Sequence, residues 1–177
     1  MLTVGALTAI GVVVAALLLT SRGGTTSAAT LGPAPGFTLP STAGGTVSLA
    51  DYRGKNVLLF FNEGAGCDAC FYQLSELEKS QAALDKANIT VLGVAPNDLG
   101  TIRPELTRFA LRTPMVADAS LTASRAYDTL GRGMHPNLPG HTFVLVGPDG
   151  TERWRGDYPS MWVDPQKLLD SVLKAAG

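Results

Sequence analysis

Two continuous apolar runs constrain the fold of this chain more than any other feature. Residues 56–62 read NVLLFFN and residues 89–95 read ITVLGVA, with apolar side chains at almost every position. A strand with one face in solvent alternates apolar and polar residues, whereas a strand buried on both faces is apolar throughout. The two runs therefore predict strands at the centre of a sheet that is covered on both sides.

The rest of the sequence alternates between helix and strand patterns around these runs. Helices are expected over residues 68–87, 101–111, 120–130 and 166–175, strands over residues 114–117, 141–146 and 151–155, and a small β element over residues 37–49. Alternating strands and helices predict an α/β fold with a mostly parallel central sheet flanked by helices. The closing hairpin adds antiparallel pairing, so the sheet is expected to be mixed.

The two cysteines of the chain, Cys67 and Cys70, lie between the first apolar run and the first expected helix. A helix N-terminus carries a partial positive charge and free N–H groups, which stabilise a thiolate, the reactive form of cysteine. The three-residue offset also brings the two sulfurs close enough to form a disulfide. Such a disulfide closes so little chain that it stabilises the fold weakly, and it is therefore suited to opening and closing.

Two other interpretations of the cysteine pair compete with redox chemistry. A CxxC motif can be half of a zinc site, which needs two further ligands, and the chain has only His135 and His141 to offer. Two cysteines can also be unreactive core residues. Neither interpretation explains why the pair lies between a strand and a helix, so we favour redox chemistry.

Two polar residues outside this motif have open roles. Glu63 precedes the cysteines and could accept a proton from a thiol, or it could be an ordinary solvated loop residue. His141 begins the strand expected to face the cysteines. It could tune a thiolate or bind a metal, or it could be a hydrogen-bonded residue at the end of a strand.

The N-terminal residues predict a membrane segment followed by a linker. Residues 2–20 contain no charged side chain, and at about 1.5 Å per residue they nearly span a hydrocarbon core of roughly 30 Å. We expect residues 1–21 to be an uncleaved transmembrane anchor, with a signal sequence as the alternative. Residues 22–36 are rich in Gly, Ser, Thr, Ala and Pro and predict a flexible linker. The folded domain is expected over residues 37–177.

Composition limits the partners of this domain. The net charge is −1 and 16% of the residues are charged, so there is no basic surplus to neutralise the phosphates of a nucleic acid. A redox-active cysteine pair meets disulfides mainly outside the cytoplasm. We therefore expect the domain to be tethered to the bacterial cell membrane and to lie on its extracytoplasmic side.

Several motifs together resemble the redoxin, or AhpC/TSA (peroxiredoxin-like), branch of the thioredoxin superfamily. They are APGFTL (34–39), VSLADYRGKNVLLFF (47–61), the CxxC motif, MVADASLTASRAYDTLG (115–131) and HTFVLVGPDGTERWRG (141–156). The resemblance covers nearly the whole domain. It implies a thioredoxin-like fold and thiol-based redox activity without a cofactor.

Within this superfamily, two reaction types fit the cysteines differently. In membrane-tethered thioredoxin-like reductases the first cysteine attacks a substrate disulfide, so Cys67 would be the nucleophile and Cys70 would resolve the mixed disulfide. In peroxiredoxins the last cysteine of P-x-x-x-(T/S)-x-x-C attacks a peroxide, and that position is Cys70. The motif's proline is then replaced by Glu63, and the arginine of the family falls at Gly140.

Our first expectation is a membrane-tethered thiol–disulfide oxidoreductase that acts on protein disulfides through Cys67 and Cys70. The alternative is a thiol peroxidase that reduces hydrogen peroxide or alkyl hydroperoxides, with Cys70 as the peroxidatic residue and Cys67 condensing with its sulfenic acid. Either activity requires a thiol electron donor that the sequence does not identify. A third reading, ranked lowest, is a copper metallochaperone that uses two thiolates and a histidine.

Overall fold

The computed structural model describes residues 31–177. The expected anchor, residues 1–21, lies outside the described residues, and so does most of the expected linker. Among residues 31–177, none of the helices combines the length and the apolar character needed to cross a membrane.

A five-stranded sheet forms the centre of the domain, with the strand order β5-β4-β3-β6-β7. The strands are β3 (Asn56–Phe61), β4 (Ile89–Ala95), β5 (Met115–Ala117), β6 (Thr142–Val146) and β7 (Glu152–Asp157). β3 pairs in parallel with β4, and β4 with β5, whereas β6 pairs antiparallel with both β3 and β7. The mixed sheet and the central position of the two apolar runs are as predicted. The sheet is not mostly parallel, however, because β6 pairs antiparallel with β3 as well as with β7.

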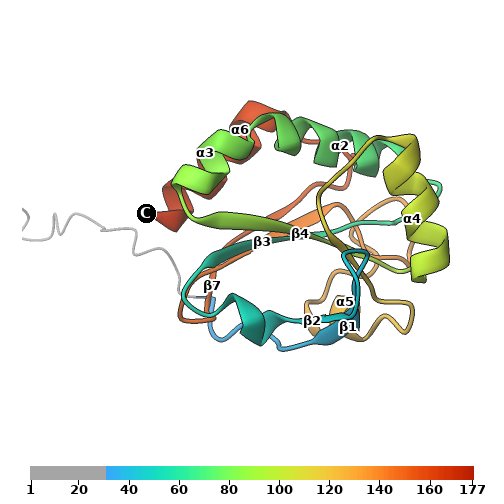
Figure 1. Cartoon of the computed structure of the whole chain (residues 1–177), viewed down its shortest axis with the longest axis horizontal. Coiled ribbons are helices and arrows are strands. Elements are labelled where there is room, and N and C mark those ends of the chain that lie inside the picture. Colours follow the sequence, from blue (N-terminus) through green and yellow to red (C-terminus); the bar gives the residue numbers. More distant parts are fainter. Residues whose placement is uncertain (1–30) are drawn as a thin grey trace, which may run out of the picture.

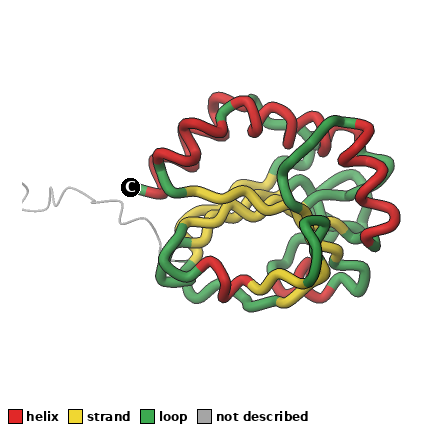
Figure 2. The backbone as a smooth tube through the Cα atoms, viewed as in Figure 1, coloured by secondary structure: helices red, strands yellow, loops and turns green. Residues whose placement is uncertain are grey.

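Helices cover one face of the sheet, and a hairpin with two short helices covers the other (Figures 1 and 2). The first face carries α2 (Asp68–Lys79), α3 (Gln81–Lys86), α4 (Leu99–Arg108) and α6 (Pro165–Ala176). The second face carries β1 (Thr38–Pro40), β2 (Thr46–Ser48), the 3-10 helix η1 (Leu49–Tyr52) and α5 (Thr122–Ala126). The central strands are therefore buried on both sides.

The side chains of β3 divide between two apolar cores. Leu58 and Phe60 enter the core beneath α2 and α6, together with Cys70. Val57, Leu59 and Phe61 enter the core on the side of β1, β2 and α5. All six residues of β3 are buried, which explains why this run lacks the alternation of a half-exposed strand.

Several helix ends differ from those that the sequence periodicity predicted, and local hydrogen bonds and backbone angles explain the differences. The helix predicted over residues 68–87 is divided at Ser80, whose amide bonds to the Leu77 carbonyl while its own carbonyl accepts from the Ala83 amide. α4 begins earlier than predicted because the Asp98 side chain caps it through the Thr101 amide. α5 is shorter than the predicted 120–130, since Leu121 and Asp128 adopt positive φ angles of 58° and 49° on either side of it.

Backbone contacts with the rest of the domain begin a few residues before Phe37. The Ala34 amide donates to the Gly150 carbonyl, the Glu152 amide donates to the Gly32 carbonyl, and Pro33 forms a bridge with Thr151. Residues 32–34 are therefore paired with the β6–β7 hairpin, upstream of the predicted boundary between residues 36 and 37.

Candidate functional site

Cys67 and Cys70 form a disulfide at the start of α2, with their Cα atoms 5.4 Å apart. Cys67 is the N-cap residue of this helix, and Cys70 lies in its first turn. The loop from β3 delivers them there, so the predicted position between a buried strand and a helix N-terminus is confirmed. The free amides of this terminus favour a thiolate when the disulfide opens.

Two asparagine side chains hold the loop that leads into the cysteines. The Gly64 amide donates to Asn62 Oδ1 (2.9 Å), and the Ala65 amide donates to Asn97 Oδ1 (2.9 Å). Gly64 has a φ of +74°, and a Cβ atom there would collide with the Asn97 side chain. A glycine is therefore required for the chain to turn from β3 into α2 at this point.

The two sulfur-bearing residues differ in exposure. Cys67 is half-buried, whereas Cys70 is 1% exposed and belongs to the apolar core beneath α2. An external molecule that approaches the disulfide therefore reaches Cys67 first.

A buried histidine lies behind Cys70. The Nδ1 atom of His141 is 3.9 Å from Cys70 Sγ, and its Nε2 atom is 3.3 Å from Gln73 Oε1. The Phe60 ring packs edge-on against the imidazole. Burial lowers the pKa of His141 to about 3, because a charged ring would lose its solvation here. His141 is therefore neutral near pH 7.

An ion-pair cluster lies on the outer side of the same helix turn. Arg108, the last residue of α4, donates from both terminal nitrogens to the Asp68 carboxylate and from Nε to Glu105 (2.9 Å). The hydrogen bonds from Arg108 lower the pKa of Asp68. The Asp68 carboxylate next to Cys67 is thus paired with a guanidinium, and this pairing weakens its electrostatic repulsion of a thiolate on Cys67.

Glu63 is buried and binds a loop rather than a thiol. Its Oε1 atom accepts hydrogen bonds from the Met134 and His135 amides (3.0 Å each), and its Oε2 atom is 2.7 Å from His135 Nδ1. The interpretation of Glu63 as a solvated loop residue is wrong, because its carboxylate anchors the segment between α5 and β6 beside the site.

The position of the family arginine cannot hold a larger side chain. A Cβ atom at Gly140 would collide with the Arg132 carbonyl group and lie 2.7 Å from the Gly133 amide nitrogen. The nearby Arg132 side chain is paired with Asp128 and Asp157. The neighbouring His141 is the residue whose side chain reaches Cys70.

Metal binding finds no support in the described part of the chain. Residues 31–177 contain no group of three or more histidine, cysteine, aspartate or glutamate side chains placed to hold a metal ion. His135 is paired with Glu63, away from the contact between His141 and Cys70.

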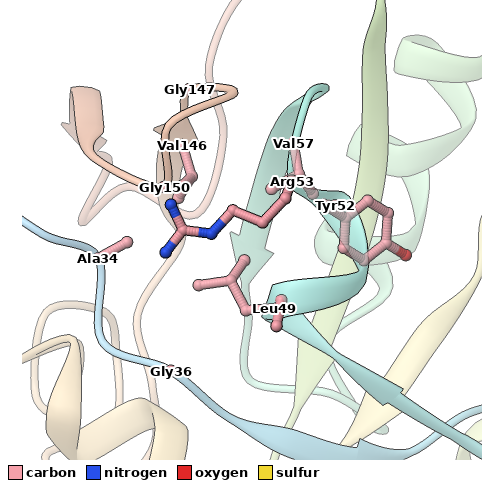
Figure 3. Close-up of a pocket in the computed structure, with 10 residues that line it drawn as sticks. Ala34, Gly36, Leu49, Tyr52, Arg53, Val57, Val146, Gly147 and Gly150 are labelled. Atoms are coloured by element: carbon pink, nitrogen blue, oxygen red, sulfur yellow. The ribbon is translucent and has the colours of Figure 1, made fainter.

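A small cavity of about 90 Å³ lies at the opposite end of β3 (Figure 3). Val57, the second residue of the strand, lines it together with Leu49, Tyr52 and Arg53. The Arg53 side chain extends across it toward Gly150 and donates to the Asp149 carbonyl. The cavity therefore lies far along the strand from the cysteines and is no part of their site.

Solved structures with this arrangement of strands and helices define the fold as thioredoxin-like. AhpC of Enterococcus faecalis superimposes with a TM-score of 0.72 over 82% of this chain and 92% of its own, at 16% identity. The peroxidoxin BcpB of Mycobacterium tuberculosis gives 0.69 over 83% and 96%, also at 16% identity. At these identities the likeness establishes the fold alone.

The sequence places the chain in a family within that fold. The model of the AhpC/TSA family matches residues 31–155, and the chain belongs to this family. A candidate peroxiredoxin of M. tuberculosis is 33% identical over 97 residues, which are 53% of this chain and 62% of the relative. The peroxiredoxin Bcp of Escherichia coli is 38% identical over 78 residues, 44% and 47% of the two chains. These matches span less than two thirds of either relative.

Sequence reasoning missed two contacts of this site. Gln73 gave no signal for this contact, because its partner His141 is 68 positions away in the sequence. Arg108 gave no signal, because its partner Asp68 is 40 positions away. Both contacts arise from helix packing, which periodicity alone does not specify.

Proposed function

We propose that this protein is a peroxiredoxin-like thiol peroxidase that reduces hydrogen peroxide or alkyl hydroperoxides through Cys67 and Cys70. The observation that carries the proposal is the disulfide between these residues at the N-terminus of α2, in a chain of the AhpC/TSA family. The peroxiredoxin relatives favour this activity over the thiol–disulfide oxidoreductase that the CxxC motif first predicted.

The proposed cycle uses both sulfurs. One cysteine thiolate attacks the peroxide, the O–O bond breaks, and the departing alkoxide takes a proton to leave an alcohol or water. The resulting sulfenic acid condenses with the second thiol, which forms the disulfide and releases water. An external thiol then reduces the disulfide. The family motif assigns the peroxide step to Cys70.

Peroxide consumption by the reduced full-length protein tests this activity. We expect turnover with a thiol donor, and loss of turnover in both Cys67→Ser and Cys70→Ser. A sulfenic acid trapped on Cys70 in Cys67→Ser supports the assignment from the family motif. Absence of reaction with hydrogen peroxide and with alkyl hydroperoxides contradicts the proposal.

One observation favours thiol–disulfide exchange as a second candidate function. Cys67 is half-buried and Cys70 is buried, which is the order of access that a reductase needs, because the first sulfur meets the substrate and the second resolves the intermediate. The test is an insulin-reduction assay combined with trapping. A stable mixed disulfide on Cys67 in Cys70→Ser, with no peroxide turnover in the native protein, would favour this candidate.

We also propose that residues 1–21 tether the domain to the cell membrane with the domain on the extracytoplasmic side. The uncharged run of residues 2–20 supports tethering, and the redox-active pair supports an oxidising compartment. The test is extraction of membranes with alkaline carbonate, followed by protease treatment of intact cells. Release by carbonate contradicts the tether, and protection from protease contradicts the orientation.

A further inference from the structure

We propose that His141 is a catalytic proton acceptor for Cys70 and that Gln73 is the positioning residue that holds its imidazole in the required tautomer. The inference deepens the proposed function, because it concerns the same cysteine pair. It rests on the contact between His141 Nδ1 and Cys70 Sγ, on the hydrogen bonds of Gln73, and on the burial of all three residues.

The Val163 backbone identifies the oxygen of the Gln73 amide. The Val163 N–H group donates to the Gln73 atom that lies 3.0 Å away, so that atom must be the acceptor Oε1. The reversed amide would place an NH₂ group against this N–H group, donor against donor. Gln73 is fully buried, so its orientation follows from this contact.

The position of the amide oxygen fixes the tautomer of His141. Because Gln73 Oε1 can only accept, the His141 Nε2 atom that lies 3.3 Å from it must carry the hydrogen. In the neutral ring, Nδ1 then has a free lone pair, and this lone pair lies on the side of Cys70. The imidazole is thus prepared to accept a proton from the Cys70 thiol.

The surroundings keep the ring neutral until Cys70 reacts. Its contacts come from Cys70 and Gln73 of α2, Phe60 of β3 and Phe143 of β6. Within residues 31–177, no hydrogen bond or salt bridge joins the ring to a charged side chain. An imidazolium here is therefore stabilised chiefly by a thiolate on Cys70, so the proton moves as that sulfur attacks.

The proton balance of each Cys70 step follows from this arrangement. When Cys70 attacks, its S–H bond breaks, the proton joins His141 Nδ1, and the sulfur forms its new bond to oxygen or to Cys67 Sγ. The leaving alkoxide, hydroxide or thiolate carries away the electron pair of the broken bond. It can then take the proton from Nδ1, which restores the neutral ring. The same role serves whether Cys70 attacks the peroxide or closes the disulfide.

The chromogenic disulfide DTNB isolates the Cys70 step without peroxide. The reduced full-length protein releases a first coloured thiolate when half-buried Cys67 attacks DTNB. It releases a second when Cys70 displaces the aromatic thiolate from Cys67 and closes the disulfide. The closure rate is measured against pH for the native protein and for His141→Phe, His141→Asn and Gln73→Met. The matched control is His135→Asn, which changes the other histidine.

A proton acceptor makes closure insensitive to pH, since the base is neutral throughout the measured range. We expect a flat rate between about pH 5.5 and pH 8 for the native protein and for the control. In His141→Phe and His141→Asn only ionised Cys70 reacts, so the rate at pH 6 falls about 100-fold and rises about tenfold per pH unit. The asparagine variant retains a polar acceptor but no base.

Several outcomes decide against the proposal. A flat profile in folded His141→Phe or folded His141→Asn rejects proton transfer to this residue. Gln73→Met is expected to slow closure about three- to tenfold, because the hydrogen of His141 is then no longer held on Nε2. An unchanged rate rejects the positioning role. This test remains decisive even if neither His141 variant folds. The assay uses DTNB in place of peroxide, so it is independent of the proposed function. If closure is flat with pH in the native protein and pH-dependent in the His141 variants, but no peroxide is consumed, the proposed function is rejected and this inference stands.

Discussion

The surroundings of the two sulfurs differ in almost every physical respect. Cys67 is half-buried at a helix N-cap, and the charged pair of Asp68 and Arg108 lies beside it in solvent. Cys70 lies one turn further on, inside the apolar core, with a neutral imidazole behind it. One disulfide therefore joins two different surroundings. On the outer side, around Cys67, the main interactions are those of exposed charges. On the inner side, around Cys70, they are the packing contacts of the buried core.

This difference separates two tasks that the proposed cycle requires. The outer side is the more exposed of the two, and the interactions of its charges weaken as salt is added. The inner side excludes water, so proton movement there depends on prearranged partners rather than on solvent. Changes on the inner side should affect both stability and reaction, whereas changes on the outer side should affect reaction alone.

Phe60→Ala should produce the largest effect. The Phe60 ring is fully buried, stacks on Phe143 at 4.2 Å and touches His141. Its removal leaves a cavity beside His141 and Phe143 and should lower the free energy of unfolding by about 3–5 kcal/mol. The outer-side control is Tyr72→Ala, in the same size class but 56% exposed, which should cost less than about 1 kcal/mol. Urea unfolding measures the loss of unfolding free energy in both variants. Losses of similar size would contradict the distinction between the two sides.

The buried histidine should make stability depend on pH. The pKa of His141 is about 3 in the folded protein against 6.5 ordinarily. Between these values the unfolded chain binds a proton that the folded chain does not, so stability is lost as the pH falls. Lowering the pH from 7 to 5 should reduce the free energy of unfolding by about 2 kcal/mol through this group.

Urea unfolding at both pH values checks this dependence. His141→Phe should lose about 2 kcal/mol less than the native protein over the same pH change. Equal pH dependence in native protein and His141→Phe would show that His141 is not held neutral in the core.

The sequence predicted the strand, the helix start and the two cysteines of the site better than the contacts among its buried side chains. The uninterrupted apolar pattern of residues 57–61 placed the strand, and the position of the CxxC motif directly after it placed both sulfurs at the helix start. The contact of His141 with Cys70 spans 71 positions and depends on β6 pairing beside β3. A histidine at the start of a strand has the same local sequence signature whether it faces a thiol or solvent, so only the assembled sheet distinguishes these roles.

Glu63→Gln tests the buried carboxylate in the loop before Cys67. The amide oxygen can still accept from the Met134 and His135 backbone, but the bond to the His135 ring is weakened. We expect a loss of about 1 kcal/mol in the free energy of unfolding and faster exchange of the Met134 and His135 amides. Unchanged exchange would mean that Glu63 does not anchor this loop.

Arg108→Gln should have the smallest effect and should act on the outer side alone. Without the guanidinium, the Asp68 carboxylate is unpaired next to Cys67 and should raise the pKa of that thiol. In a Cys70→Ser background, iodoacetamide should modify Cys67 about threefold more slowly at low salt, with the difference shrinking near 1 M salt. Arg103→Gln, on the same helix, is the control. A salt-independent loss would mean that Arg108 acts by packing on Phe109 rather than by its charge.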